Sequence, residues 1–278
     1  MINLIIATIC FSLSFGLIKS QLVTLPSEYV VFFRLFLAAL FFLPFIRKGI
    51  QKKHFLAAFI GIIQFGVMFL CFIKAFKYLQ GNEIALLTTT TPVFVAIWAS
   101  IFGEKFKFIY ILCILMSVLG AGIIVWQNIT FEMMIKGILM METSNCTFAL
   151  GQILWKKHIN DTSSKYMFSA YFGASIFVLL ISIFNINFTT ISITTPQILS
   201  ILYLAIIPTG IGFWLWNKGS VTVKSSTLAI MNNLKIPFAI LFSVLIFHEK
   251  INIINFSIGA SIILASIIIL DLAVKNKK

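Results

Sequence analysis

Two stretches of the sequence decide the fold, TTPVFVAIWASIFGEKF at residues 90–106 and KIPFAILFSVLIFHEKI at residues 235–251. Each has a proline in third place, continues through a run without Asp, Glu, Lys or Arg, and closes in Glu-Lys. An apolar run of this kind is typical of a helix in a bilayer. The matching proline and Glu-Lys indicate that the chain contains an internal repeat.

The segment after each stretch repeats as well, because both copies carry a small residue at every fourth position. These residues are Cys113, Ser117 and Ala121 in the first copy and Ser257, Ser261 and Ala265 in the second. Such a stripe lies on one face of a helix and lets two membrane helices approach closely. Packing within one chain and a homodimer are the two alternatives.

The composition excludes an ordinary soluble protein. Of the 278 residues, 60% are hydrophobic and only 10% are charged, and the mean hydropathy is +1.06. A soluble domain carries roughly 25% charged residues. The net charge of +13 is distributed in short clusters between apolar stretches, so it indicates loops beside a membrane and not a nucleic-acid partner.

Apolar runs bounded by charge, proline, glycine or asparagine predict ten transmembrane helices. They lie at about residues 1–18, 28–46, 54–73, 82–101, 107–126, 133–154, 166–184, 197–217, 224–246 and 253–272. An even number of spans places both termini on one side. Most of the 21 lysines and arginines fall in segments that are inside when the N-terminus is inside, which predicts cytoplasmic termini in a bacterial inner membrane.

The repeat divides the chain into residues 1–127 and residues 128–278, with five predicted spans each. Because five is odd, the second half enters the membrane from the opposite side. Inverted repeats are typical of secondary transporters, whose substrate site lies near the midplane between the halves. The predicted fold class is an all-α integral membrane protein with ten transmembrane helices as two inverted five-helix repeats.

The proline and Glu-Lys of the two quoted stretches resemble the EamA family of the drug/metabolite transporter superfamily. Arg34 in the second span and the run Trp214-Leu215-Trp216-Asn217-Lys218 are similar to that family too, and the resemblance covers essentially the whole chain. It implies a carrier that exchanges small metabolites, often amino acids or their relatives, without ATP or a cofactor. Trp214 and Asn217 are substrate-binding candidates, with an interfacial anchor as the alternative for Trp214.

Glu142 is an acidic residue inside a predicted span, with Asn145 and Gln152 on the same helical face. This face is predicted to line a cavity, because lipid would demand an apolar surface there. Glu142 is therefore the candidate for proton coupling or for binding an amine. The alternative is a salt bridge to Lys235 or Lys136 that only fixes packing.

Three cations are candidates for binding an anion. Lys235 shares a helical face with Asn232 in the ninth span, and both are predicted to line the cavity. Arg34 presents donors in a fixed fork that suits a carboxylate, with an outer gate as the alternative. Lys74 ends the third span, either as a cavity residue or as an interface anchor. These cations outnumber Glu142, which favours an anionic or zwitterionic solute.

Pro92 and Pro237 are predicted to kink their helices, because each removes an intrahelical hydrogen bond and clashes with the preceding turn. The kinks are either hinges between the halves or packing features without motion.

The sequence contains neither GxxxxGK[ST] nor HExxH, so direct use of ATP, a catalytic metal site and an enzyme are not expected. The predicted function is a secondary transporter of a small anionic or zwitterionic metabolite, such as an amino acid, a carboxylate or S-adenosylmethionine, by alternating access. The alternatives are an exporter of hydrophobic cations or lipids and a membrane partner subunit without transport.

Overall fold

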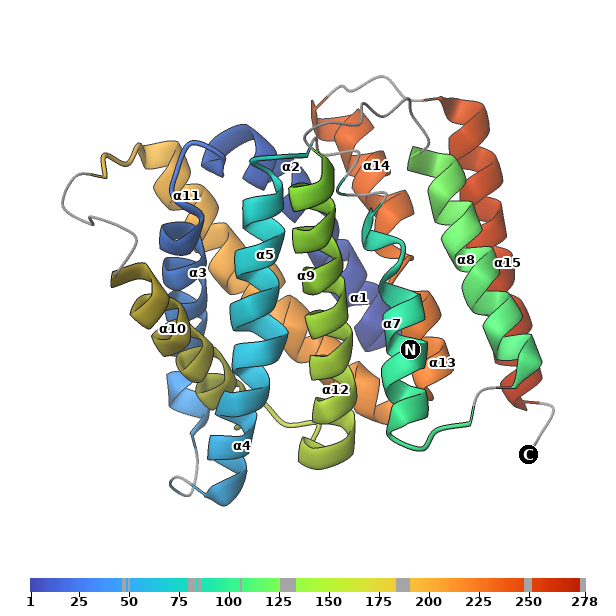
Figure 1. The fold of residues 1–278 in the computed structure, drawn as a ribbon, viewed down its shortest axis with the longest axis horizontal. Helices are drawn as coiled ribbons and strands as arrows, with labels where there is room; N and C mark the ends of the chain where they lie inside the picture. The colour runs from blue at the N-terminus through green and yellow to red at the C-terminus, as the bar shows by residue number, and fades with distance from the viewer. Residues whose placement is uncertain are drawn as a thin grey trace.

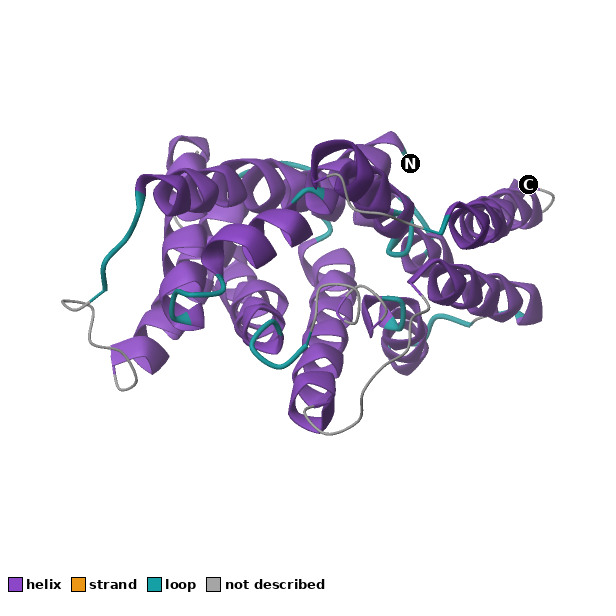
Figure 2. Ribbon diagram, turned by 90° about the horizontal axis from the view of Figure 1, so that it is seen from above, coloured by secondary structure: helices purple, strands orange, loops and turns teal. Residues whose placement is uncertain are grey.

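The computed structural model describes residues 1–46, 49, 51–79, 84, 87–105, 107–125, 134–183, 191–247 and 252–275. Within these residues the chain is helical, and Figure 2 shows no strand in this part. The predicted boundary between residues 127 and 128 lies outside them, as do Arg47, Lys48, Glu249 and Lys250. The all-helical class predicted from the sequence is confirmed.

Before residue 126, three helical runs are each divided into shorter helices, and two single helices follow them. In chain order, the helices are α1 (Ile2–Ser12), α2 (Ser14–Leu17), the π-helical η1 (Ile18–Leu22), α3 (Ser27–Phe42), the 3-10 helix η2 (Leu43–Phe45), α4 (Lys52–Gly61), the π-helical η3 (Ile62–Val67), α5 (Met68–Ala75), α7 (Thr91–Ile101) and α8 (Phe108–Val125).

The helices after residue 133 include divided runs and single helices as well. They are α9 (Met134–Leu154), the π-helical η4 (Trp155–Ile159), α10 (Met167–Ile183), α11 (Thr195–Leu204), the π-helical η6 (Ala205–Gly212), α12 (Phe213–Thr222), α13 (Ser225–Met231), α14 (Lys235–Phe247) and α15 (Ile253–Lys275).

Among the described residues, four helical runs are long and apolar enough to cross a membrane. These runs are Ile2–Leu22, Ser27–Phe45, Lys52–Ala75 and Thr195–Thr222. Shorter apolar helices include Thr91–Ile101, Phe108–Gly120, Met167–Ile183 and Ile253–Ile269. Length and composition therefore support a protein that spans a membrane several times.

The helices lie side by side along one common direction, with α8 against α15 at one edge and α3 against α10 towards the other (Figure 1). Glycines permit the closest contacts between them. A Cβ atom on Gly61 of α4 would lie 2.0 Å from the carbonyl oxygen of Ala170 in α10. A Cβ atom on Gly120 of α8 would lie 2.8 Å from the carbonyl oxygen of Gly259 in α15. Any larger residue would force these helices apart.

The two small-residue stripes do not face each other. Cys113 and Ser117 of α8 are buried, whereas Ser257 and Ser261 of α15 are exposed. The contact between α8 and α15 therefore passes Gly120 and Gly259 instead, and it lies within one chain.

A cluster of Glu104, Lys156 and Ser225 joins the loop after α7 to η4 and to the start of α13. The Lys156 ammonium lies 3.0 Å from Glu104 Oε1 and donates to Ser225 Oγ at 2.8 Å, while Ser225 Oγ donates to Glu104 Oε1 at 2.7 Å. Burial raises the pKa of Glu104, but the hydrogen bonds from Ser225 and Lys156 and the Lys156 charge lower it further, so the net pKa is below its usual value. Glu104 belongs to the first Glu-Lys pair of the repeat, so the structure gives that glutamate a role in fixing α7 to α9 and α13.

Candidate functional site

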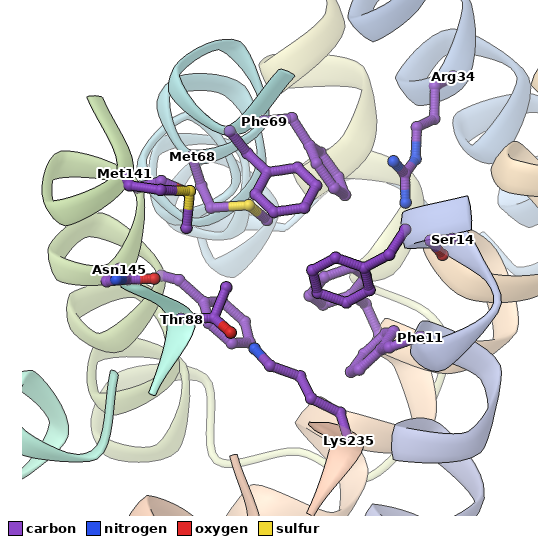
Figure 3. Close-up of a pocket in the computed structure, with 14 residues that line it drawn as sticks. Phe11, Ser14, Arg34, Met68, Phe69, Thr88, Met141, Asn145 and Lys235 are labelled. Carbon is purple, nitrogen blue, oxygen red and sulfur yellow. The ribbon is translucent and has the colours of Figure 1, made fainter. Parts of the chain in front are cut away.

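A cavity lies between the helices (Figure 3). Its walls are mainly phenylalanine and methionine side chains, with a few polar groups among them. This composition is typical of a small-molecule site. The lining residues are Phe11, Ser14, Phe15, Arg34, Met68, Phe69, Phe72, Thr88, Met141, Ser144, Asn145, Phe148, Phe213 and Lys235.

Arg34 reaches the cavity from α3, and only 2% of its surface is exposed. Its Nε donates a hydrogen bond to Thr209 Oγ1, and its guanidinium carbon lies 4.0 Å from the centre of the Phe69 ring. The hydroxyl of Tyr171 donates to the Thr209 carbonyl and so braces the same segment. The guanidinium is held in one place, but its Nη1 has no hydrogen-bond partner among the described residues.

Lys235 is the first residue of α14, directly after a turn at Asn232–Leu234 that separates α13 from α14. Its backbone carbonyl accepts a hydrogen bond from Ser12 Oγ at 3.0 Å. Its ammonium lies 6.0 Å from the centre of the Phe148 ring, and no ion pair within the described ranges includes it. Figure 3 shows Lys235 and Arg34 entering the cavity from different sides.

Asn145 lines the cavity, but its amide is fully engaged by the chain segment before α7. Its Nδ2 donates to the Leu87 carbonyl at 2.8 Å and to Thr90 Oγ1 at 3.0 Å, while its Oδ1 accepts from Thr91 Oγ1 at 3.2 Å. Asn145 therefore positions the start of α7 and has little capacity left for a ligand.

Glu142 lies one turn before Asn145 in α9 and outside the lining of the cavity. Its Oε2 accepts a hydrogen bond from Thr90 Oγ1 at 2.8 Å. The alternative predicted for it, a salt bridge to Lys235 or Lys136, is not among the ion pairs of the described residues. Glu142 is instead tied to the same break before α7 that Asn145 braces.

Three further candidates are held in pairs of amide side chains. Gln64 Nε2 donates to Asn217 Oδ1 at 2.9 Å, which joins η3 to α12. Asn232 Nδ2 donates to Gln152 Oε1 at 3.3 Å, which joins the turn before α14 to α9. The structure therefore places Asn217, Gln152 and Asn232 in contacts between helices and not on the cavity wall.

Lys74 and Trp214 also lie away from the cavity. The Lys74 ammonium is 2.6 Å from Glu28 Oε1, so it forms an ion pair between the end of α5 and the start of α3. The Trp214 ring lies 5.2 Å below the Lys218 ammonium and 6.5 Å from the Phe42 ring. Of the predicted site residues, the structure brings Arg34, Asn145 and Lys235 together at the cavity.

Pro92 and Pro237 stand in the first turn of α7 and α14, just after a break in the helix. Before α7, Thr90 Oγ1 lies 2.9 Å from the Leu87 carbonyl and Thr91 Oγ1 lies 2.8 Å from the Thr88 carbonyl. The single proton of each hydroxyl is therefore shared between that carbonyl and an acceptor on α9. Threonine hydroxyls thus bind carbonyls at the break where the helical pattern stops.

Sequence reasoning missed Ser14, Thr88 and Ser144 of the cavity wall. Ser14 stands directly after the end of α1, 6% of it is exposed, and its Oγ has no hydrogen-bond partner among the described residues. Its one signal in the sequence is a pair of serines, Ser12 and Ser14, within an otherwise apolar first span. No cluster of His, Cys, Asp or Glu able to hold a metal ion occurs in the searched part of the chain.

Comparisons with known proteins identify transporters that are similar to this chain. The model of the EamA-like transporter family matches residues 1–126 and 135–271. The chain is 33% identical to the "Biotin transporter" of Escherichia coli (strain K12), over 95% of this chain and 90% of that protein. It is 30% identical to the "Probable biotin transporter" of Pseudomonas aeruginosa, over 95% of both chains. A protein crystal structure superimposes with a TM-score of 0.79 at 13% identity, over 98% of this chain and 96% of the other, which shows the same fold.

Proposed function

The chain belongs to the EamA-like transporter family, and from this premise we propose that it carries biotin, or a carboxylate of similar shape, across the bacterial inner membrane. The family and the named relatives make it a multi-pass membrane transporter of a small metabolite, so the expectation that it is not an enzyme is confirmed.

The proposed substrate is chosen from the charge of the residues that line the cavity. Its described lining contains the cations Arg34 and Lys235 and no carboxylate. An amino acid or S-adenosylmethionine would bring a cationic group that needs an acidic partner, and a hydrophobic cation would be repelled. Biotin brings one carboxylate, an aliphatic chain and a neutral fused ring, which match two cations and apolar walls. The proposal therefore narrows the predicted anionic or zwitterionic solute to a monocarboxylate.

Alternating access between two inverted five-helix halves, residues 1–127 and 128–278, is the proposed mechanism. This proposal is supported by irregular helical segments that occur in corresponding predicted spans of the two halves. The π-helical η3 and η6 interrupt the third and eighth predicted spans, and breaks precede α7 and α14 in the fourth and ninth. In the fifth and tenth predicted spans, α8 packs against α15. Irregular segments in matching helices can change shape at modest cost, so they suit paired gates.

We further propose that both termini are cytoplasmic. The support is the excess of Lys and Arg in the segments that this orientation places inside. Cysteine labelling from the two sides of intact spheroplasts tests it, since residues such as Lys165 would react from the inside and Lys136 from the outside once replaced by cysteine. The reverse pattern would invert the assignment.

Glu142 remains the proposed proton site, because of its link to Thr90. Thr90 Oγ1 carries one proton, and both Leu87 O and Glu142 Oε2 lie within reach of it. An ionised Glu142 accepts that hydrogen bond, whereas a protonated Glu142 becomes a donor and leaves Thr90 to Leu87. Protonation would thus change the contacts at the break before α7. Glu142→Gln should remove the dependence of uptake on a pH gradient, with Thr143→Val, an exposed neighbour, as the control.

The decisive experiment is uptake and counterflow of radiolabelled biotin in proteoliposomes with the purified chain. Saturable uptake that unlabelled biotin competes out, and that a cationic dye does not, is the expected result. Folded protein without saturable biotin flux would refute the proposed substrate, and a panel of other monocarboxylates would then be tested in the same vesicles.

A further inference from the structure

We propose that Arg34 and Ser14 form a carboxylate subsite at one end of the cavity, and that Lys235 binds the neutral polar end of the same substrate. This inference rests on the proposed function, since it assigns the orientation of a carboxylate such as biotin in the site. Figure 3 shows Arg34 and Ser14 on the same side of the cavity, with the Lys235 ammonium away from them and directed towards Thr88.

The Arg34 guanidinium is held in place, but not all of its donors are hydrogen-bonded. Thr209 holds its Nε and the Phe69 ring supports its plane, so the fork cannot turn freely. Nη1 is nevertheless buried without a partner among the described residues. A buried donor of this kind is costly to leave unsatisfied, and at the wall of a cavity a ligand can supply the missing acceptor. A planar, fixed and charged donor is best matched by a carboxylate.

Ser14 supplies the second group of this subsite. The α1 helix ends at Ser12 and α2 begins at Ser14, so the chain is interrupted at the cavity wall. Ser14 Oγ is buried and also has no partner among the described residues. A serine hydroxyl donates one hydrogen bond, which the second oxygen of a carboxylate can accept. Two unsatisfied donors beside one cavity indicate one ligand group with two acceptor atoms.

The Lys235 end of the cavity has a different chemistry. Its ammonium stands on a flexible stem and donates well to a single carbonyl oxygen. Thr88 and Ser144 lie on the cavity wall as hydroxyl groups that can accept as well as donate. A ureido ring needs a donor for its carbonyl and acceptors for its N–H groups, and this mixture provides both. A carboxylate has no N–H group, so it would not use the acceptors.

The wall between the two ends is apolar. Phe69, Phe148 and Phe213 contribute rings, and Met68 and Met141 contribute flexible thioether side chains that adapt to irregular shapes. An aliphatic chain and a sulfur-containing ring lose little by leaving water for such a surface. The cavity is therefore polar at both ends and apolar in the middle, in the same order as an acid chain attached to a ureido ring.

The test compares biotin with biotinamide, in which a neutral carboxamide replaces the carboxylate. Binding to purified protein is measured for the wild type, Arg34→Gln, Ser14→Ala and the matched control Lys235→Gln. The wild type should prefer biotin by roughly tenfold or more, as expected for loss of a charged hydrogen-bonded pair. Arg34→Gln should reduce this preference to nearly one and Ser14→Ala should reduce it in part. Lys235→Gln should weaken both ligands and keep most of the preference.

A preference that survives in Arg34→Gln and disappears in Lys235→Gln would overturn the inference by reversing the orientation. Ser14→Ala is a small change that should fold even where Arg34→Gln does not, and an unchanged preference in Ser14→Ala removes Ser14 from the subsite. Failure of the proposed function has a separate signature, because the folded wild type would then bind neither biotin nor biotinamide.

Discussion

Two sets of polar side chains lie within the helices, one in contacts between helices and one at the wall of the cavity. The interhelical set consists of Gln64 with Asn217 and Gln152 with Asn232, and each pair is bonded across two segments. At the cavity, Arg34 keeps an unpartnered Nη1 and Lys235 has no ion pair in the described part of the chain. Gln152 Nε2 and Asn232 Oδ1 also lack a partner among the described residues, so an unpartnered polar atom indicates a ligand only where its residue also lines the cavity.

The energetic reason is the absence of water in the bilayer interior. An unsatisfied buried polar group costs about 1–3 kcal/mol, so a chain that keeps one sacrifices stability. Binding sites commonly carry such a cost because the ligand later supplies the missing partner. The two sets should therefore respond to mutation in opposite ways, the cavity through transport and the interhelical pairs through stability.

The largest effect is expected for Lys235→Met. Removing the ammonium should lower the apparent affinity for biotin by roughly tenfold or more, because a buried charge with a ligand partner is lost. The midpoint of thermal unfolding in detergent should not fall, because Met keeps the length of the side chain and removes an unpaired charge. Uptake kinetics and a thermal unfolding curve on the same preparation check both parts.

Gln152→Met is the matched control for this change, because it also places Met at a buried polar position. It should lower the unfolding midpoint and leave the Michaelis constant for biotin close to that of the wild type. If Lys235→Met destabilises the protein while Gln152→Met abolishes uptake, the division between the two sets is wrong.

An intermediate effect on stability is expected at the Gln64–Asn217 pair. Gln64→Leu or Asn217→Leu alone should each lower the free energy of unfolding by about 1 kcal/mol, because the partner amide is left buried and unsatisfied. The double variant should lose less than the sum of the two. Thermal unfolding of the four proteins gives the coupling energy, and strictly additive losses would show that the amides do not depend on each other.

A smaller effect is expected at the cluster of Glu104, Lys156 and Ser225, where Glu104 is partly exposed to solvent. Glu104→Gln should cost less than about 1 kcal/mol at neutral pH, as for most exposed ion pairs. The pKa of Glu104 is lowered from its usual 4.5, so its contribution is present above that pH and is lost as the pH falls through the lowered value. The difference in unfolding midpoint between the wild type and Glu104→Gln should therefore shrink below about pH 4. A difference that grows on acidification would contradict the assignment.

The sequence predicts the apolar helices, because composition alone decides that such a chain leaves water. It also predicts Arg34 and Lys235, since a cation within an apolar span is rare enough to stand out. It does not predict which polar residues satisfy each other. Asn217 lies far from Gln64 in the chain, and Ser225 lies far from Glu104, so these pairings depend on how the helices pack.

The sequence also does not predict where the helices break. Ser14 reaches the cavity because α1 stops at Ser12, and Lys235 begins α14 because a turn precedes it. Apolar residues continue through such breaks, so the sequence pattern predicts one straight transmembrane helix. The prolines mark two of the breaks, but no proline marks the one before Ser14.

The smallest effect is expected for Trp214→Phe, at a residue for which the sequence offers a stacking surface and an interfacial anchor as alternatives. Phe213 and Trp214 are neighbours on α12, but Phe213 lines the cavity and Trp214 does not. Trp214→Phe should change the Michaelis constant for biotin by less than about twofold, the range of a substitution away from special features. Phe213→Leu, a shrinkage of similar size, should raise it several-fold more, because Phe213 also packs 4.4 Å from Phe11 at the cavity wall. Equal effects at the two positions, measured by uptake in matched proteoliposomes, would mean that the substrate reaches beyond the cavity to the Trp214 ring.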